Sequence, residues 1–180
     1  MYGRAKDFMK RLSGRKPLFI CTLGSTETAK IQGLSAAGRN PQLTDYTPPA
    51  DAELLFYGRC RCVEGVPVTP EGITTPALIT MSALQLADIP VLIVVGGLNV
   101  KPHTPFIDLG GEHGGDIRSG RAVKRVGEVL ERAELAGRAF SKLADYIVVG
   151  ESVPGGTTTA LAVLLAMGVD ARGKISSSMI

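Results

Sequence analysis

Four short apolar runs stand out along the chain, each bounded by glycine, proline or charged residues. They are rich in β-branched and aromatic side chains, and their apolar positions are continuous rather than alternating. Continuous runs of this length are typical of strands that are covered on both faces, as in a parallel sheet. We therefore predict strands at residues 18–23 (LFICTL), 52–58 (AELLFYG), 91–95 (VLIVV) and 146–149 (YIVV).

Helical patterns alternate with these runs. Thr75-Pro76 is a cap followed by a proline at the first helical position, which predicts a helix over residues 77–87. A third helix is expected from Thr157 or Thr158 to Met167, ending at Gly168. In the sequence between these two predicted helices, residues 123–145 carry apolar side chains at spacings of three and four. This is the stripe of an amphipathic helix, formed by Val126, Leu130, Ala133, Ala136, Phe140 and Leu143.

Strands that alternate with helices predict a three-layer α/β/α fold with a mainly parallel, Rossmann-like sheet. In such folds, ligands bind at the carboxyl ends of the strands. Three loops rich in small and polar residues follow predicted strands, at residues 24–27, 96–99 and 150–159. We expect the chemistry of the protein at these loops.

The chain of 180 residues is 44% hydrophobic and 21% charged, which suits one globular domain. Its charge is uneven, because residues 1–16 hold six basic residues against one acid, Asp7. The net charge of the chain is +3. This basic N-terminal arm contributes +5, so residues 17–180, the predicted nucleotide-binding domain, carry −2. A basic arm could touch a nucleic acid, a membrane surface or a phosphate. We favour an amphipathic helix with Phe8, Met9 and Leu12 facing inward, because no pattern of a nucleic-acid module follows.

The start of the chain lacks the apolar core of a signal peptide, and the longest apolar stretch, residues 160–169, is half of the ~20 residues that cross a membrane. We expect no membrane association. The three cysteines, Cys21, Cys60 and Cys62, form no disulfide framework, so reduced thiols in a cytoplasmic protein are expected. Cys60 and Cys62 are placed at a strand end without the second pair that a zinc site needs.

The loop that follows residues 146–149 has the composition of a phosphate-binding turn. Gly155 and Gly156 allow successive backbone N–H groups to point at one spot, and residues 157–159 add three threonine hydroxyls. The helix behind them contributes about half a positive charge at its N-terminus. The P-loop and dinucleotide fingerprints are both absent. A tight turn capped by threonine is the structural alternative.

Glu151 lies beside this loop, where a carboxylate is a poor ligand for phosphate. It is better suited to orienting ribose hydroxyl groups or to facing a cationic ring. Its structural alternative is a surface glutamate, or one that caps local amides.

The segment GESVPGGTTTALAVLLAMG (residues 150–168) resembles the Gly-Glu-Met-Gly-Ile-Gly-Asn-Thr-Thr segment of the nicotinate-nucleotide–dimethylbenzimidazole phosphoribosyltransferases. The likeness to the archaeal and cyanobacterial relatives is closer and covers nearly the whole chain, but only the N-terminal half of that family's length. We therefore expect that the chain is truncated at its C-terminal end, Ile180. The further motifs are STET (25–28), GLSAAG (33–38), YTPPADAELLFYG (46–58), KPHTPFIDLG (101–110), GDIRSG (115–120) and GKISSSM (173–179).

The resemblance implies transfer of phosphoribose from nicotinate mononucleotide to a benzimidazole-type base, which gives the α-ribazole phosphate of cobamides. It also implies a homodimer, and it implies neither a metal nor an organic cofactor. The general base of the bacterial enzymes is a glutamate of the C-terminal half, which this chain does not match. Val153 and Gly156 stand where the bacterial motif has Gly and Asn. The matching phosphate-loop positions are Gly150, Glu151, Gly155, Thr157 and Thr158, and Gly156 is expected to offer its amide.

Other candidates are weaker. Ser25, Thr26 and Glu27 could cap a helix or contact substrate, and Lys101 begins a segment that could form a wall of the base or ribose pocket. Asp108, Glu112, His113 and Asp116 are expected in a solvated loop rather than at a metal. His103 and His113 are expected to be surface or loop residues rather than catalytic ones. Two other functions stay open: a nucleotide-binding module without catalysis, and an interaction protein whose basic arm contacts nucleic acid.

Overall fold

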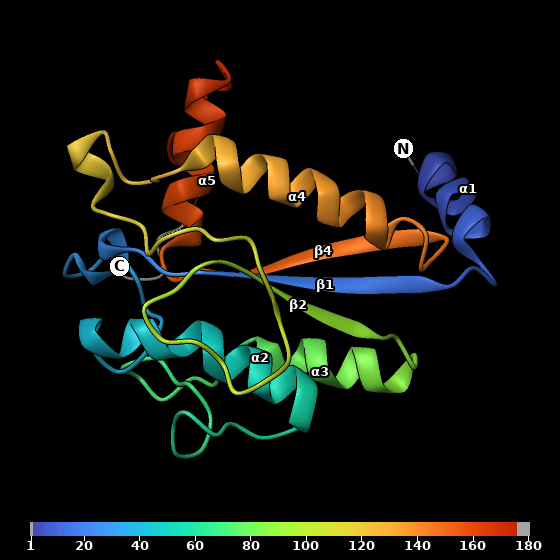
Figure 1. Cartoon of the computed structure of the whole chain (residues 1–180), viewed down its shortest axis with the longest axis horizontal. Helices are drawn as coiled ribbons and strands as arrows, with labels where there is room; N and C mark the ends of the chain where they lie inside the picture. The colour runs from blue at the N-terminus through green and yellow to red at the C-terminus, as the bar shows by residue number, and fades with distance from the viewer. Residues whose placement is uncertain (1, 176–180) are drawn as a thin grey trace.

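A computed structural model describes residues 2–175, so residues 176–179 of the GKISSSM motif and the chain end at Ile180 lie outside the described part. Four parallel strands form its centre in the order β3-β2-β1-β4 (Figure 1). Three of them match the predicted strands closely. The strands are β1 (Pro17–Gly24), β2 (Val91–Gly97), β3 (Ile107–Asp108) and β4 (Tyr146–Ser152).

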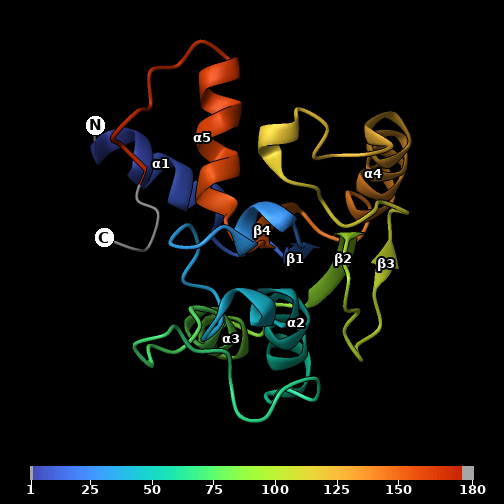
Figure 2. The same ribbon diagram turned by 90° about the vertical axis from the view of Figure 1, so that its left-hand side faces the viewer.

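Helices cover both faces of the sheet, which confirms the three-layer α/β/α fold (Figure 2). One face carries α2 (Thr47–Tyr57) and α3 (Ala77–Leu86), and the other carries α4 (Val126–Phe140) and α5 (Gly156–Ala166). Short 3₁₀ helices occupy the loops: η1 (Glu27–Lys30), η2 (Pro41–Tyr46) and η3 (Ile117–Ser119). Within residues 2–175, no helix is long and apolar enough to cross a bilayer.

Side chains of β1 alternate between two apolar cores. Leu18 and Ile20 pack on the α4 side, with Phe140. Cys21 and Leu23 pack on the other side, with Ala52 of α2 and with the central residues of β2. This period of two explains the continuous apolar run of β1, since both faces of the strand are buried.

The predicted strand at 52–58 is wrong, because these residues lie in α2. This helix begins with Pro48 and Pro49 in its first turn and ends at Gly58, which has a φ of 71°. Its first eight residues are all buried, so it shows no amphipathic stripe. Cys60 and Cys62 therefore follow a helix rather than end a strand.

The stripe predicted for α4 is only partly correct. Ala133, Ala136 and Phe140 do pack onto the sheet, together with Val129. Val126, Leu130 and Leu143, which we expected on the same face, are 56%, 58% and 66% exposed.

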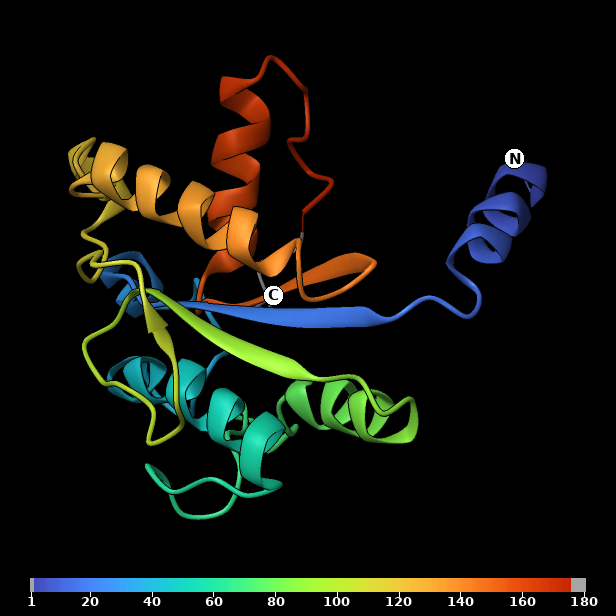
Figure 3. The same ribbon diagram turned by 45° about the vertical axis from the view of Figure 1, so that its right-hand side comes forward.

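The basic N-terminal arm forms a helix, as predicted, over Tyr2–Leu12 (α1). Figure 3 shows α1 standing apart from the three layers, beyond the amino end of β1. Phe8 and Met9 are 52% and 66% exposed, so the expectation that they face inward is wrong.

The chain winds away from β1 in two directions. From β1 it passes through α2 and α3 to β2 and then to β3 on one side, and it returns through α4 to β4 on the other side of β1. The order of the strands therefore reverses between β1 and β4. In open α/β sheets, this switch point at the carboxyl ends of the strands is where ligands bind.

Candidate functional site

A cavity of about 530 Å³ lies at the switch point between β1 and β4. Phe19 and Cys21 of β1 line it, together with residues 150–152 of β4 and the loop 153–157 that leads into α5. These strands are in register there, since Cys21 pairs with Gly150 and Leu23 with Ser152. The opposite wall comes from residues 34–38, from α2 and from the segment that enters α3. The volume is that of a site for a small organic ligand.

The start of α5 forms one end of this cavity. Gly155 caps the helix with a φ of 70°, and the Gly156 N–H donates to the Val153 carbonyl at 2.9 Å, which closes a tight turn. Among the described residues no side chain caps the helix, so the threonine-capped turn is not what the structure shows. Within residues 2–175, the N–H groups of Gly155 and Thr157 have no protein acceptor. Free N–H groups at the positive end of a helix dipole can bind an anion.

Gly150 brings the aromatic wall of the cavity close to β4. A Cβ at position 150 would lie 2.6 Å from Cζ of Phe19, so only glycine lets the ring lie over the strand. The Gly150 carbonyl accepts a hydrogen bond from Thr22 Oγ1 at 2.8 Å, which fixes the strand from β1. Gly150 thus shapes the cavity rather than offering a group to a ligand.

Glu151 lies against the first turn of α5. A Cβ on Gly156 would stand 2.6 Å from Glu151 Oε1, so carboxylate and helix start are in close contact. Partial burial raises the pKa of the Glu151 carboxyl. The predicted loop residues Gly155, Gly156 and Thr157 are therefore gathered with Glu151 at one end of the cavity. Thr158 follows them in α5 but does not line this cavity.

Asp51 is a second carboxylate in the cavity, and the sequence did not reveal it. The residue is buried on α2, and its two oxygens accept hydrogen bonds from Thr75 Oγ1 at 2.8 Å and Ser152 Oγ at 2.7 Å. Burial raises the pKa of the Asp51 carboxyl, and the two hydroxyl donors counter part of that rise. The signal that could have identified it is a carboxylate in the buried first half of a largely apolar helix, a feature that Asp51 shares with Glu53.

Cys21 lines the same cavity as an unreactive thiol. Burial, reinforced by the negative charges of Asp51 and Glu151, raises the pKa of Cys21 to about 12. Because the thiolate is the nucleophile, Cys21 is not suited to covalent catalysis at neutral pH.

Ser25 and Glu27 lie outside the lining of this cavity and meet at His113. The Ser25 hydroxyl is 2.8 Å from His113 Nδ1, and Glu27 Oε1 is 2.6 Å from His113 Nε2. Ser25 Oγ also accepts the Asn99 N–H, so its own proton is free for Nδ1, and Nε2–H then donates to Glu27. His113 lies in a loop, as expected, but its side chain is only 15% exposed, so the expectation that it is solvated is wrong.

This cluster has the residue types of a hydrolytic triad, but its serine is 5% exposed and is not accessible to a substrate. The contacts instead join the loop that follows β1 to the loops that follow β2, through Asn99, and β3, through His113. Thr26 has the capping role that we predicted, since its Oγ1 accepts the Thr28 N–H at the start of η1. It also donates to the Gly115 carbonyl at 2.8 Å.

Lys101 and the acidic residues of the following segment form surface ion pairs. Lys101 is 56% exposed and bonds to Asp108 at 2.7 Å, away from the lining of the cavity. Glu112 pairs with Lys124 and Asp116 with Arg118. Exposed pairs of this kind contribute little to stability. His103, in contrast, bonds to the buried Glu53 through Nδ1, although its own ring is 61% exposed.

Comparisons with known proteins identify relatives that are about twice as long. The chain is 52% identical over 175 residues to a UPF0284 protein of Archaeoglobus fulgidus, which covers 96% of this chain and 51% of that protein. It is 45% identical over 182 residues to a UPF0284 protein of Methanothermobacter thermautotrophicus, with 99% and 50% of the two chains covered. No family model matches the chain. The chain thus spans about half the length of the curated relatives it matches, and their name states no activity.

Proposed function

We propose that the cavity between β1 and β4 binds nicotinate mononucleotide and that the protein transfers its phosphoribosyl group to a benzimidazole-type base, giving α-ribazole phosphate. The observation that carries this proposal is the position of the cavity at the switch point, with free N–H groups at one end and two carboxylates in its walls. The resemblance of residues 150–168 to the phosphoribosyltransferases supplies the choice of donor. The homodimer stays a prediction of the same resemblance.

The phosphate group of the nucleotide would lie at the start of α5. The N–H groups of Gly155 and Thr157 and the Thr157 hydroxyl are the donors there. In the described lining, the absence of a basic side chain leaves the helix dipole and these donors to hold the anion. This arrangement is suited to a phosphate monoester rather than to a triphosphate, which needs a lysine and a metal.

The carboxylates are suited to the charge that develops during transfer. When the C1′–N bond breaks, its electron pair leaves with the nicotinate ring, which loses its positive charge, while C1′ becomes electron-deficient. Carboxylates near C1′ stabilise that centre, and Glu151 and Asp51 are the two in the described lining of the cavity. A lone pair of the incoming base then bonds to C1′, and its ring N–H proton passes to a general base that we do not assign to this chain.

A second cavity, of about 670 Å³, offers a place for the acceptor. It shares Gly38, Thr47, Pro67 and Val68 with the lining of the first cavity, so the two adjoin. Its other walls include Leu43, Tyr46 and Val66, which are apolar or aromatic. A flat heteroaromatic base fits such a lining.

Calorimetric titration with nicotinate mononucleotide tests the proposal. Thr157→Val removes one donor and should weaken binding about three- to tenfold. Thr159→Val is the matched control, because Thr159 lies on the same helix but does not line the cavity. Glu151→Ala should weaken binding of the nucleotide but not of inorganic phosphate, since the carboxylate repels a phosphate.

A transfer assay then separates catalysis from binding. The chain is incubated with nicotinate mononucleotide and 5,6-dimethylbenzimidazole, and α-ribazole phosphate is sought by chromatography. Binding together with product supports the transferase. Binding without product supports a nucleotide-binding module of the same fold, and no binding by a folded chain contradicts both functions.

A further inference from the structure

The charged side chains that line the first cavity are all acidic. Among the described residues in its walls, Asp51 and Glu151 are carboxylates, and no lysine, arginine or histidine is present. Glu151 lies beside the start of α5, where the free N–H groups are, and Asp51 lies in the wall formed by α2, away from those donors. A ligand with an anionic end and a cationic end matches this distribution, whereas a nucleotide with a neutral base matches only one part of it.

Asp51 is held in place from two sides. Thr75 Oγ1 donates to Oδ1 and also accepts the Ala77 N–H at 3.2 Å, so the hydroxyl is fixed between α2 and the start of α3. Ser152 Oγ donates to Oδ2 from the end of β4. Each carboxylate oxygen thus has one partner and keeps a lone pair that can face a ligand. A carboxylate held in this way is already oriented before a ligand arrives.

Phe19 adds an aromatic face to the same cavity. Its ring lies over Gly150, in contact with β4, and lines the cavity beside Cys21. The face of an aromatic ring attracts a cation and gives no such preference for a neutral ring.

Thr47 gives an independent indication that a ligand binds here. The residue is 9% exposed and lines both adjoining cavities, at the first turn of α2. Within residues 2–175, its Oγ1 has no hydrogen-bond partner. A buried hydroxyl without a partner is unfavourable unless a ligand or a water completes its hydrogen bonds.

We infer that Asp51, together with Phe19, is a specificity-determining residue that selects nucleotides with a positively charged ring over nucleotides with a neutral ring. This inference rests on the proposed nucleotide site and names the chemistry that the site recognises. A cationic ring brings a compensating charge to a carboxylate that is largely removed from water. When a neutral ring covers that carboxylate, the carboxylate loses its contact with water and gains no opposite charge. This disfavours binding.

Nicotinamide mononucleotide and its reduced form test this directly, because they carry the same ribose phosphate and differ chiefly in the charge of the ring. Calorimetry on the whole chain should give affinity for the oxidised form about tenfold higher than for the reduced form. In Asp51→Asn, which keeps the shape of the side chain, the ratio should fall to about two. Asp108→Asn is the matched control, since Asp108 pairs with Lys101 at the surface, and its ratio should stay that of the unmodified chain.

A second variant covers the possibility that Asp51→Asn does not fold, which circular dichroism would reveal. Phe19→Leu keeps an apolar side chain but removes the aromatic face, and it should also lower the ratio. Equal affinities for the two forms in the unmodified chain would overturn the inference, as would an unchanged ratio in folded Asp51→Asn.

The outcome is separable from that of the proposed function. A preference for the oxidised form without any phosphoribosyl transfer supports this inference together with the nucleotide-binding module. Transfer without such a preference overturns this inference alone. No binding of either form by the folded chain overturns both.

Discussion

The ring of Phe19 on β1 lies so close to Gly150 on β4 that a Cβ at position 150 would be 2.6 Å from its Cζ atom. This contact joins the two strands that flank the switch point, and it sets the position of the aromatic wall of the cavity. The pairing of β1 with β4 and the shape of the site therefore both depend on the absence of a side chain at position 150.

Gly150→Ala should lower both stability and nucleotide binding. The added methyl group must displace the Phe19 ring, and overpacking of this kind costs about 1–3 kcal/mol of unfolding free energy. The displaced ring would also enter the cavity, so we expect affinity for nicotinate mononucleotide to fall at least severalfold. Urea unfolding and calorimetry measure the two effects.

Gly137→Ala is the matched control for this substitution. Gly137 lies within α4, and a Cβ there meets nothing within 4 Å. Because alanine favours the helix, this variant should be more stable by up to about 1 kcal/mol and should bind normally. If Gly150→Ala were as stable and bound as well as Gly137→Ala, the contact with Phe19 would not restrict position 150 to glycine.

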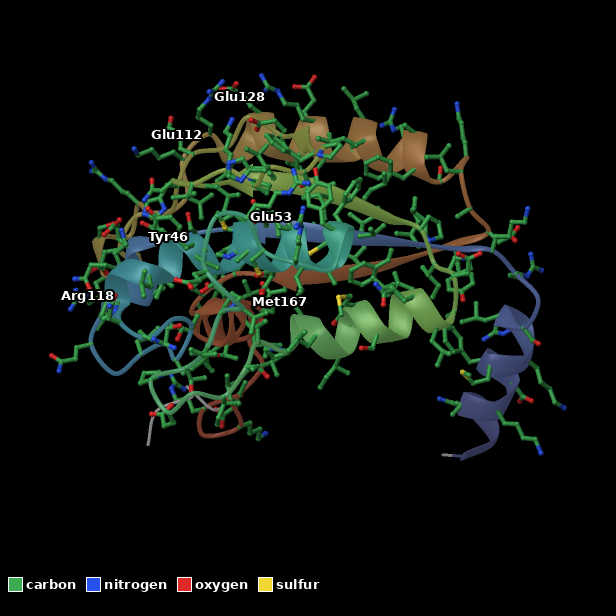
Figure 4. All side chains as sticks on the ribbon, turned by 90° about the horizontal axis from the view of Figure 1, so that it is seen from below. Tyr46, Glu53, Glu112, Arg118, Glu128 and Met167 are labelled. Atoms are coloured by element: carbon green, nitrogen blue, oxygen red, sulfur yellow. The ribbon has the colours of Figure 1, made fainter. Side chains whose placement is uncertain are left out.

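Glu53 lies on α2 (Figure 4). From its contacts we predict that the stability of the protein depends on pH. The residue is 0% exposed, and its carboxylate accepts the N–H groups of Arg61, Cys62 and His103 and a further bond from His103 Nδ1. Burial alone would raise the pKa of Glu53, but these donors outweigh it and lower the pKa from 4.5 to about 2. The bonds tie α2 to two loops that follow it in sequence.

A lowered pKa means that the folded chain binds this proton more weakly than the unfolded chain does. The stabilisation is therefore fully present above pH 4.5 and is lost as the pH falls toward 2. It corresponds to about 3 kcal/mol at neutral pH. We expect Glu53→Gln to be less stable by about that amount at pH 7, because the amide turns a donor toward N–H groups.

The difference between the two proteins should shrink between pH 5 and pH 3, and urea unfolding at pH 7, 5 and 3 measures it. Comparison with Glu53→Gln isolates this residue from other carboxylates, such as Asp108, whose pKa is also lowered. A difference that stayed constant over this range would mean that Glu53 does not titrate as the geometry implies.

Ser25→Ala separates a structural role from substrate contact. Removing the hydroxyl leaves the Asn99 N–H and His113 Nδ1 without their partner, which should cost about 1–3 kcal/mol of stability. Because Ser25 does not line the cavity, affinity for nicotinate mononucleotide should remain within about twofold.

Ser82→Ala is the control, because the exposed Ser82 bonds only to the Leu78 carbonyl of its own helix. It should change stability by no more than about 0.5 kcal/mol. A Ser25→Ala protein of normal stability that lost tenfold in affinity would instead identify Ser25 as a substrate contact.

The sequence predicted the strands that are buried on both faces, because continuous apolar runs follow directly from that environment. The same rule failed at residues 52–58, since α2 is also buried around most of its surface and loses its helical period. Thr47-Pro48 and Gly58 were the informative signals, and Thr47-Pro48 matches the Thr75-Pro76 pair that correctly located the start of α3.

The candidate site was predictable where it is contiguous in sequence, as in residues 150–157. Asp51 and His113 were missed for a different reason. Each gains its role from partners that are far away in the chain: Asp51 from Ser152, and His113 from Ser25 and Glu27. No local pattern encodes such contacts, because the topology of the sheet brings these segments together.

The basic arm, residues 1–16, makes little contact with the rest of the protein. Phe8 and Met9 of α1 are exposed. At the end of the arm, the Lys16 N–H donates a hydrogen bond to the Asp145 carboxylate at 2.8 Å, which joins the arm to the rest of the protein. Deleting residues 1–14 preserves that bond and should change the unfolding free energy by no more than about 0.5 kcal/mol. Affinity for nicotinate mononucleotide should also be retained, since the arm lies at the opposite end of β1 from the cavity (Figure 1).

The same deletion tests whether the arm contacts nucleic acid. The intact and shortened chains are compared for binding to duplex DNA and to RNA at low and at physiological salt. An arm that forms a helix without contacting nucleic acid gives no binding by either chain. Residues 1–14 hold four basic residues and one acid, a net charge of +3. Binding by the intact chain that weakens steeply with salt and disappears on deletion would instead assign these charges to phosphate contacts.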